Sequence, residues 1–154
     1  MDKILVTGGL GFIGSHTVVE LQNSGYEVII IDDLSNSSFD VLHRISTITG
    51  ITPKFEQIDL KNKAKVIDFF KRNKDLKGVI HFAASKAVGE STEQPLMYYE
   101  NNINTLVYVL QELKNLNHTN FIFSSSCTVY GQADELPITE KAPVKIAESP
   151  YGNT

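Results

Sequence analysis

A glycine-rich segment that directly follows an apolar run is the first part of the chain able to bind a ligand. The run Ile4–Val6 leads into Thr7–Gly14, in which glycines recur at every third residue. Gly8 can adopt backbone angles that other residues avoid, Gly11 leaves room for a phosphate, and Gly14 allows a helix to pack closely on the strand. Free amides at the start of that helix favour a pyrophosphate. A tight turn without a ligand would use the same glycines.

A pair of acidic residues supplies the second half of the pattern. The apolar run Val28–Ile31 ends in Asp32 and Asp33, and Asp32 lies 18 residues after Gly14. An acidic side chain at about this distance accepts hydrogen bonds from the adenosine ribose in dinucleotide-binding folds. No arginine lies closer than Arg44 to meet a 2′-phosphate, so NAD is favoured over NADP. Two aspartates that merely end a strand are the alternative interpretation.

Alternating strands and helices would position these residues. The sequence predicts strands at about 3–7, 27–32, 54–58, 78–82 and 120–123. Helices are predicted over about 12–24 and 39–49, around 66–70, and from Ser91 or Thr92 to Leu113. This order is typical of an α/β fold of the Rossmann type. Right-handed crossovers give a doubly wound parallel sheet of order 3-2-1-4-5, truncated after strand five.

The last of these helices carries a regular apolar pattern. Its apolar residues alternate steps of three and four, which predicts a buried stripe. The members of the stripe are Leu96, Tyr99, Ile103, Leu106, Leu110 and Leu113.

Ligands bind at the carboxyl ends of the strands in such a sheet. The residues at those ends are therefore expected to converge on one edge. They are the glycine turn, Asp32, Asp59, the segment from Ala83 to Lys86, and Ser126.

Composition excludes several function classes. With 14 basic and 18 acidic residues, nothing points to nucleic acid or a membrane surface, and no apolar run approaches the roughly 20 residues of a membrane span. The N-terminus enters a strand within three residues, so no signal peptide is expected. The single cysteine, Cys127, fits a reducing cytoplasm. The histidines lack metal-ligand spacing, so no metal site is expected; they are His16, His43, His81 and His118.

The chain resembles the N-terminal part of the UDP-glucose 4-epimerases, a family of extended short-chain dehydrogenase/reductases. The spacing G-x-x-G-x-x-G is the variant associated with the latter group, and the resemblance covers the whole chain. The matching segments are Thr7–His16, Asp32–Ser37, His81–Ser91, Tyr98–Asn102, Phe121–Ser126, Thr128–Gly131 and Ser149–Gly152.

The resemblance implies a set of NAD contacts. The pyrophosphate would be surrounded by Gly8, Gly11, Phe12, Ile13 and Gly14. The adenosine ribose would be bound by Asp32, Asn36 and Ser37, with Asp33, Leu34 and Ser35 in the same loop, and the adenine would be bordered by Asp59 and Leu60. The nicotinamide side would be lined by Phe82, Ala83, Ala84, Ser85, Lys86, Asn101, Ser126 and Tyr151.

The resemblance also implies a reaction that interconverts UDP-galactose and UDP-glucose. Tyr151 would take the proton of the sugar 4-hydroxyl while hydride passes from C4 to NAD. Ser126 would steady the oxygen, and Lys86, Ser126 and Tyr151 would contact substrate. The 4-keto sugar would then turn over and take the hydride back on its other face. Taken without the resemblance, Ser126 could be a polar strand end, Tyr151 a half-buried aromatic, and Asn101 a solvated helix residue.

Rival functions differ in identifiable residues. Nucleotide-sugar 4,6-dehydratases place an Asp-Glu pair after strand five, where this chain has Cys127 and Thr128. Other nucleotide-sugar epimerases, and a non-catalytic NAD-binding module, stay open as alternatives.

One helper of the tyrosine is missing from the 154 residues. A free tyrosine has a pKa of about 10 and needs a neighbouring cation to ionise near neutrality. In the family this is a lysine four residues after Tyr151, a position beyond Thr154. We expect one incomplete NAD-binding domain over 1–154, without the C-terminal substrate domain, with strand five uncovered. By itself it is expected to be inactive and poorly soluble, whereas the full-length family members commonly form homodimers.

Overall fold

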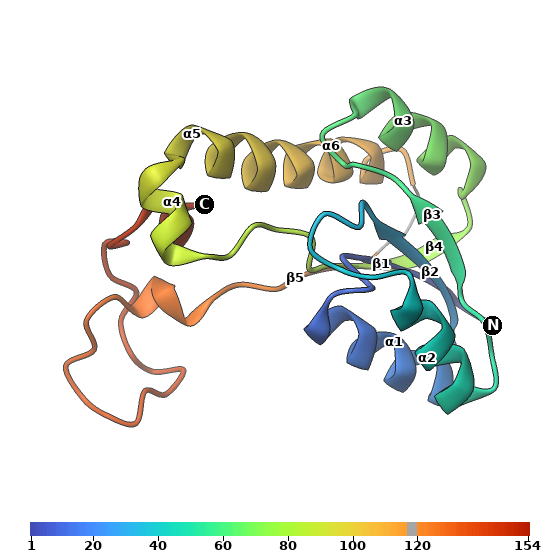
Figure 1. Ribbon diagram of the computed structural model, residues 1–154, viewed down its shortest axis with the longest axis horizontal. Coiled ribbons are helices and arrows are strands. Elements are labelled where there is room, and N and C mark those ends of the chain that lie inside the picture. Colours follow the sequence, from blue (N-terminus) through green and yellow to red (C-terminus); the bar gives the residue numbers. More distant parts are fainter. Residues whose placement is uncertain (117–119) are drawn as a thin grey trace.

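The computed structural model describes residues 1–116 and 120–154, which contain a five-stranded parallel sheet of order β3-β2-β1-β4-β5 (Figure 1). The strands are β1 (Lys3–Thr7), β2 (Glu27–Asp32), β3 (Lys54–Gln57), β4 (Leu76–His81) and β5 (Asn120–Phe123). The helices are α1 (Phe12–Asn23), α2 (Asp40–Thr49), α3 (Lys63–Arg72), α4 (Val88–Glu93), α5 (Pro95–Tyr98), a π-helical turn η1 (Tyr99–Ile103), α6 (Asn104–Leu113), a 3₁₀ turn η2 (Cys127–Tyr130) and α7 (Pro150–Asn153). The predicted strand order is confirmed.

The register of the central strands brings their carboxyl ends to one level. Thr7 at the end of β1 pairs with Ile31 on one side and with His81 on the other. β4 begins at Leu76, two residues before the predicted start, because Leu76 is buried and pairs with Lys3. The loops that follow β1, β2 and β4 therefore leave the sheet side by side.

Two apolar layers cover the sheet because successive strand residues point to opposite faces. Val6 and Ile30 pack with buried residues of α1 and α2, among them Val18. Leu5 packs on the other face, with buried residues of α3 and α6 such as Phe69. In Figure 1, α1 and α2 lie below the sheet and α3 and α6 above it.

The predicted stripe on the last long helix is wrong by one residue. The fully or nearly buried positions are Tyr98, Asn102, Thr105 and Val109, whereas Leu96 is 82% exposed. Two of the four buried side chains are bonded through polar groups to the loop after β4. These bonds orient the helix, and the apolar side chains of the predicted stripe are left half-exposed or exposed.

Strand β5 forms the open edge of the sheet, as expected. Phe121 packs against the core, but Ile122 and Phe123 are 57% and 46% exposed. Their apolar surface is uncovered in the 154-residue chain.

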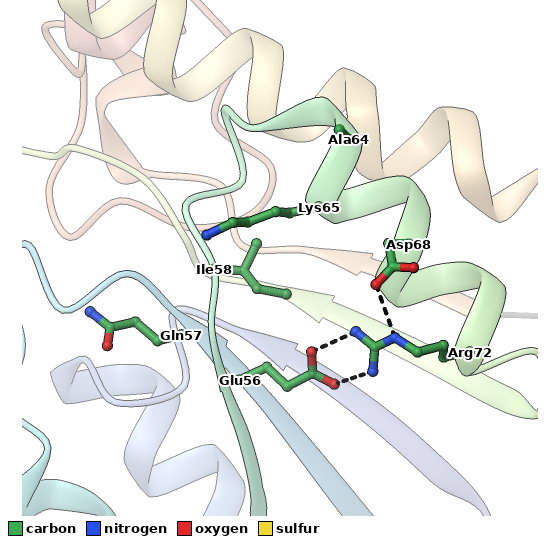
Figure 2. A pocket seen from close by; sticks show the side chains of 7 residues that line it. All are labelled: Glu56, Gln57, Ile58, Ala64, Lys65, Asp68 and Arg72. Carbon is green, nitrogen blue, oxygen red and sulfur yellow. Dashed lines mark hydrogen bonds and ion pairs between the residues drawn. The ribbon is translucent and has the colours of Figure 1, made fainter.

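At the opposite edge, ion pairs join β3 to α3 around a shallow pocket (Figure 2). Arg72 donates two hydrogen bonds to Glu56, at 3.0 and 2.8 Å, and a third to Asp68 at 3.0 Å. The guanidinium of Arg72 is therefore paired with two carboxylates of the same fold. The ion pairs brace the edge strand that leads into Asp59.

Candidate functional site

The glycine turn after β1 is shaped by contacts with both neighbouring strands. Gly8 has φ +66°, and its N–H donates to the Ile31 carbonyl at 2.8 Å. A Cβ atom at Gly8 would lie 2.8 Å from the backbone nitrogen of Ala83. Only glycine therefore fits between β2 and the loop that follows β4.

The other two glycines of the turn are constrained by the turn itself. The Gly11 N–H donates to the Gly8 carbonyl at 3.1 Å, and a Cβ at Gly11 would lie 3.2 Å from that oxygen. A Cβ at Gly14 would overlap the same oxygen. Close packing at Gly14 matches its predicted purpose. At Gly11, where we predicted that the missing side chain leaves room for a phosphate, the close Gly8 carbonyl is a second reason why a side chain fits poorly.

Substitution of Gly14 by alanine is expected to lower the free energy of unfolding by about 1–3 kcal/mol, the usual cost of overpacking. The new methyl group meets backbone atoms of Gly8 and Gly9, which cannot rotate away. Gly89→Ala is the control, because Gly89 has open space around its Cβ position. Urea denaturation measures both, and equal stability of the two variants would contradict the assigned packing.

The N-terminus of α1 is open and has the character of an anion site. No side chain caps this helix, whose first turn follows Gly11. Phe12 and Ile13 are 78% and 57% exposed. The positive end of the helix dipole and its first amides thus face solvent at the carboxyl edge of the sheet, where a phosphate group fits.

Asp32 ties two loops of the site together. Its carboxylate accepts hydrogen bonds from Leu10 N–H at 3.0 Å, Leu34 N–H at 3.0 Å and the Ser37 hydroxyl at 2.7 Å. The residue is 8% exposed. A carboxylate has about four acceptor positions, so one is left for a ribose hydroxyl.

The loop after β2 carries the remaining predicted ribose contacts. Leu34 has φ +65°, and Asp33 accepts hydrogen bonds from the Ser35 amide and hydroxyl at 2.9 and 2.6 Å. Asn36 is exposed. This tight loop places Ser37 beside Asp32.

The predicted adenine contacts follow β3. Leu60 is buried, whereas Asp59 is half-buried and accepts the Lys61 N–H at 2.9 Å. Both residues lie at the same end of the sheet as Asp32, because β3 pairs in parallel with β2.

Asn102 is a site residue that the sequence interpretation missed. Its amide oxygen accepts Ser85 N–H at 2.8 Å, and its Nδ2 donates to Ser85 O and to Thr154 Oγ1, both at 2.9 Å. Asn101 donates to the Ser85 hydroxyl at 3.2 Å. The sequence signal that could have identified Asn102 is the pair of adjacent asparagines, Asn101 and Asn102, within a helix of otherwise apolar spacing. The π-helical turn η1 directs both side chains to the segment from Phe82 to Lys86.

The predicted catalytic pair lies on two short elements that touch. Ser126 accepts hydrogen bonds from Thr128 N–H at 3.3 Å and Thr128 Oγ1 at 3.0 Å, which leaves its own O–H free to donate. Tyr151 lies in α7, where a Cβ on Gly152 would be 3.3 Å from Thr128 Oγ1. Lys86 is exposed on the facing loop.

His81 is a second buried polar residue next to the site. Its Nδ1 lies 2.8 Å from Thr7 Oγ1, and Thr7 Oγ1 accepts the Ala83 N–H at 3.4 Å. The imidazole tautomer decides which of the two groups, the Thr7 hydroxyl or Nδ1 of His81, donates in this bond. Burial lowers the pKa of His81 to about 4.

Within residues 1–116 and 120–154, no three His, Cys, Asp or Glu side chains gather as a metal site. His118 lies outside the described residues. Over the same ranges, no helix has the length and apolar character needed to cross a bilayer.

Comparison with known proteins identifies the family of the chain. Residues 4–154 match the family model described as "NAD dependent epimerase/dehydratase family". The chain belongs to this family. It is 47% identical over 152 residues to UDP-glucose 4-epimerase of Neisseria meningitidis serogroup B and 48% identical over 151 residues to that of Bacillus subtilis. These matches take in 99% and 98% of the chain, but 44% of each relative.

Solved structures of the family agree with the fold. UDP-glucose 4-epimerase from Bifidobacterium longum, solved in complex with NAD+ and UDP, superposes with a TM-score of 0.93 at 45% identity. The match covers 99% of this chain and 45% of that one. The chain of this epimerase/dehydratase family member thus spans less than half the length of the relatives it matches.

Proposed function

We propose that the chain is the NAD-binding part of a UDP-glucose 4-epimerase. One observation carries the proposal. The open helix end after the glycine turn, the buried Asp32 carboxylate, the loop from Phe82 to Lys86, and Ser126 with Tyr151 all lie at the carboxyl edge of one sheet. The first two fit a dinucleotide, and the last pair fits a sugar hydroxyl beside it.

The residues would divide the work as follows. NAD, when bound, would supply the reversible hydride chemistry at C4 of the sugar. Phe12 and Ile13 amides hold the pyrophosphate, and Asp32 accepts a ribose hydroxyl through its remaining acceptor position.

The proton of the sugar hydroxyl would be transferred at the end of the site that holds Ser126 and Tyr151. Tyr151 takes the proton of the sugar 4-hydroxyl, and the free O–H of Ser126 donates to the same oxygen. We propose that Lys86, which is exposed on the loop after β4, donates to the nicotinamide ribose and the substrate.

The rest of the catalytic apparatus is assigned to the region that follows this match in the longer family members. We propose that this region holds the lysine of the Y-x-x-x-K pattern and a substrate domain, so that residues 1–154 form the cofactor domain. A homodimer of the longer protein would also cover three exposed apolar side chains, Leu96 of α5, Ile103 of η1 and Leu110 of α6.

Two assays test the proposed function. The 154-residue chain is expected to bind NAD but not to interconvert UDP-galactose and UDP-glucose. A chimera in which the C-terminal half of the Bacillus subtilis relative follows Thr154 is expected to catalyse the interconversion. Turnover by the chain alone, or an inactive but folded chimera that binds NAD, would contradict the division of labour.

Replacement of Asp32 by alanine is expected to weaken NAD binding about 10- to 100-fold, the value of a hydrogen bond to a charged group together with loosened loops. Asp2→Ala is the control, since Asp2 is exposed and lies directly before β1, at the amino-terminal side of the sheet. Isothermal titration with NAD measures both variants, with their unfolding free energies taken alongside. Unchanged affinity of Asp32→Ala would remove Asp32 from the ribose site.

A further inference from the structure

Tyr98 is the largest fully buried side chain of the described chain, and it is polar. Its hydroxyl donates to Glu90 Oε2 at 2.7 Å and accepts the Ala87 N–H at 2.9 Å. Ala87 directly follows Lys86, the last residue of the loop that faces Ser126 and Tyr151. A phenylalanine would fill the same space, but it would leave the Ala87 amide without this acceptor.

The ring of Tyr98 meets the candidate base. The centroids of the Tyr98 and Tyr151 rings are 6.4 Å apart, with an angle of 72° between the planes. This edge-to-face arrangement is the favoured one for aromatic pairs. One side chain therefore touches the loop after β4 with its hydroxyl and Tyr151 with its ring.

The element that carries Tyr151 depends on such contacts. α7 has four residues, too few for a helix to be stable without packing. Two hydrogen bonds also join it to the long helix: Asn153 Nδ2 donates to Tyr99 Oη at 2.6 Å, and Asn102 Nδ2 donates to Oγ1 of the C-cap residue Thr154 at 2.9 Å. The orientation of the Tyr151 phenol is thus set by neighbouring side chains rather than by its own backbone.

We propose that Tyr98 is a positioning residue that holds Tyr151 and the loop ending in Lys86 and Ala87 in one fixed arrangement. The proposal rests on the proposed role of Tyr151 as the base. Proton transfer requires hydrogen-bond reach of about 2.6–3.2 Å, so small displacements of the phenol matter. Tyr98 itself keeps its proton, since burial and the bond to Glu90 raise its pKa.

The ring contact is tested by NMR on the 154-residue chain with ¹³C-labelled tyrosine, Tyr151→Phe providing the assignment. Wild type is expected to show a nuclear Overhauser effect between the two rings. Tyr98→Leu should shift the Tyr151 ring resonances, whereas Tyr98→Phe should restore them to their wild-type positions. Tyr108→Leu, on the far part of α6, is the matched control. Unmoved Tyr151 resonances in folded Tyr98→Leu would overturn the proposal.

The hydroxyl contact is tested by amide hydrogen exchange. Tyr98→Phe is expected to speed exchange at Ala87 about tenfold, as one lost hydrogen bond would, and Tyr108→Phe should leave it unchanged. Equal exchange at Ala87 in wild type and Tyr98→Phe would overturn the proposal even if Tyr98→Leu fails to fold. Neither readout involves NAD or turnover. Failure of NAD binding or of the chimera therefore refutes the proposed function and is distinct from failure of these contacts.

Discussion

Replacement of Tyr151 by phenylalanine in the chimera is expected to lower kcat about 10²- to 10⁴-fold, the usual contribution of general acid–base catalysis. The phenylalanine ring keeps the contact with Tyr98 but has no group to take the proton of the sugar hydroxyl. Ser126 cannot substitute, because its oxygen already accepts two hydrogen bonds from Thr128 and its free proton can only donate.

The measurement is the rate of UDP-galactose conversion at saturating substrate. KM should change little, since the phenol acts mainly in the transition state. Tyr26→Phe serves as the control because Tyr26 lies directly before β2, at the amino-terminal side of the sheet. Turnover of Tyr151→Phe near that of Tyr26→Phe would show that another group is the base.

Acidification from pH 7 to 4.5 is expected to cost the chain about 2–3 kcal/mol of folding stability through His81 alone. Burial lowers the pKa of His81 to about 4 in the folded chain, against about 6.5 when exposed. Between these values the unfolded chain binds more protons. The stabilisation is therefore complete above pH 6.5 and is lost as the pH falls toward 4.

Urea denaturation at the two pH values measures this loss. His81→Gln removes the titrating group while its amide can still form a hydrogen bond with Thr7, so its stability should fall by about 2–3 kcal/mol less than that of wild type. His43→Gln, at an exposed position of α2, should behave as wild type. If His81→Gln and wild type lost equal stability in acid, the buried neutral imidazole would be refuted.

Most of the architecture could be predicted from local patterns. Five strands and the helices α1, α2 and α3 fall within a few residues of their expected bounds, since short β-branched runs and glycine stops depend on nearby residues alone. Gly25, which follows the C-cap residue of α1, has φ +85°, a left-handed conformation that glycine adopts readily at helix ends. Strand order followed from the handedness of the crossovers.

The long helix was the main failure because its orientation is not a local property. Its apolar spacing predicted a buried stripe that included Leu96 and Tyr99, yet Tyr98 and Asn102 face inward. The spacing of apolar residues carries no information on hydrogen bonds to a loop 11 to 17 residues away along the chain. For the same reason the roles of Asn102 and His81 could not be found from spacing.

By itself, the sequence determined the sheet, its order, the glycine turn and the family, because each rests on residue types at short, regular intervals. Tertiary structure decided how the loops meet: that Asp32 joins the glycine turn to its own loop, that Asn102 holds Ser85 and Thr154, and that Tyr98 lies between Ala87 and Tyr151. These contacts join segments far apart along the chain. Their geometry exists only once the parallel strands have brought the loops to one edge.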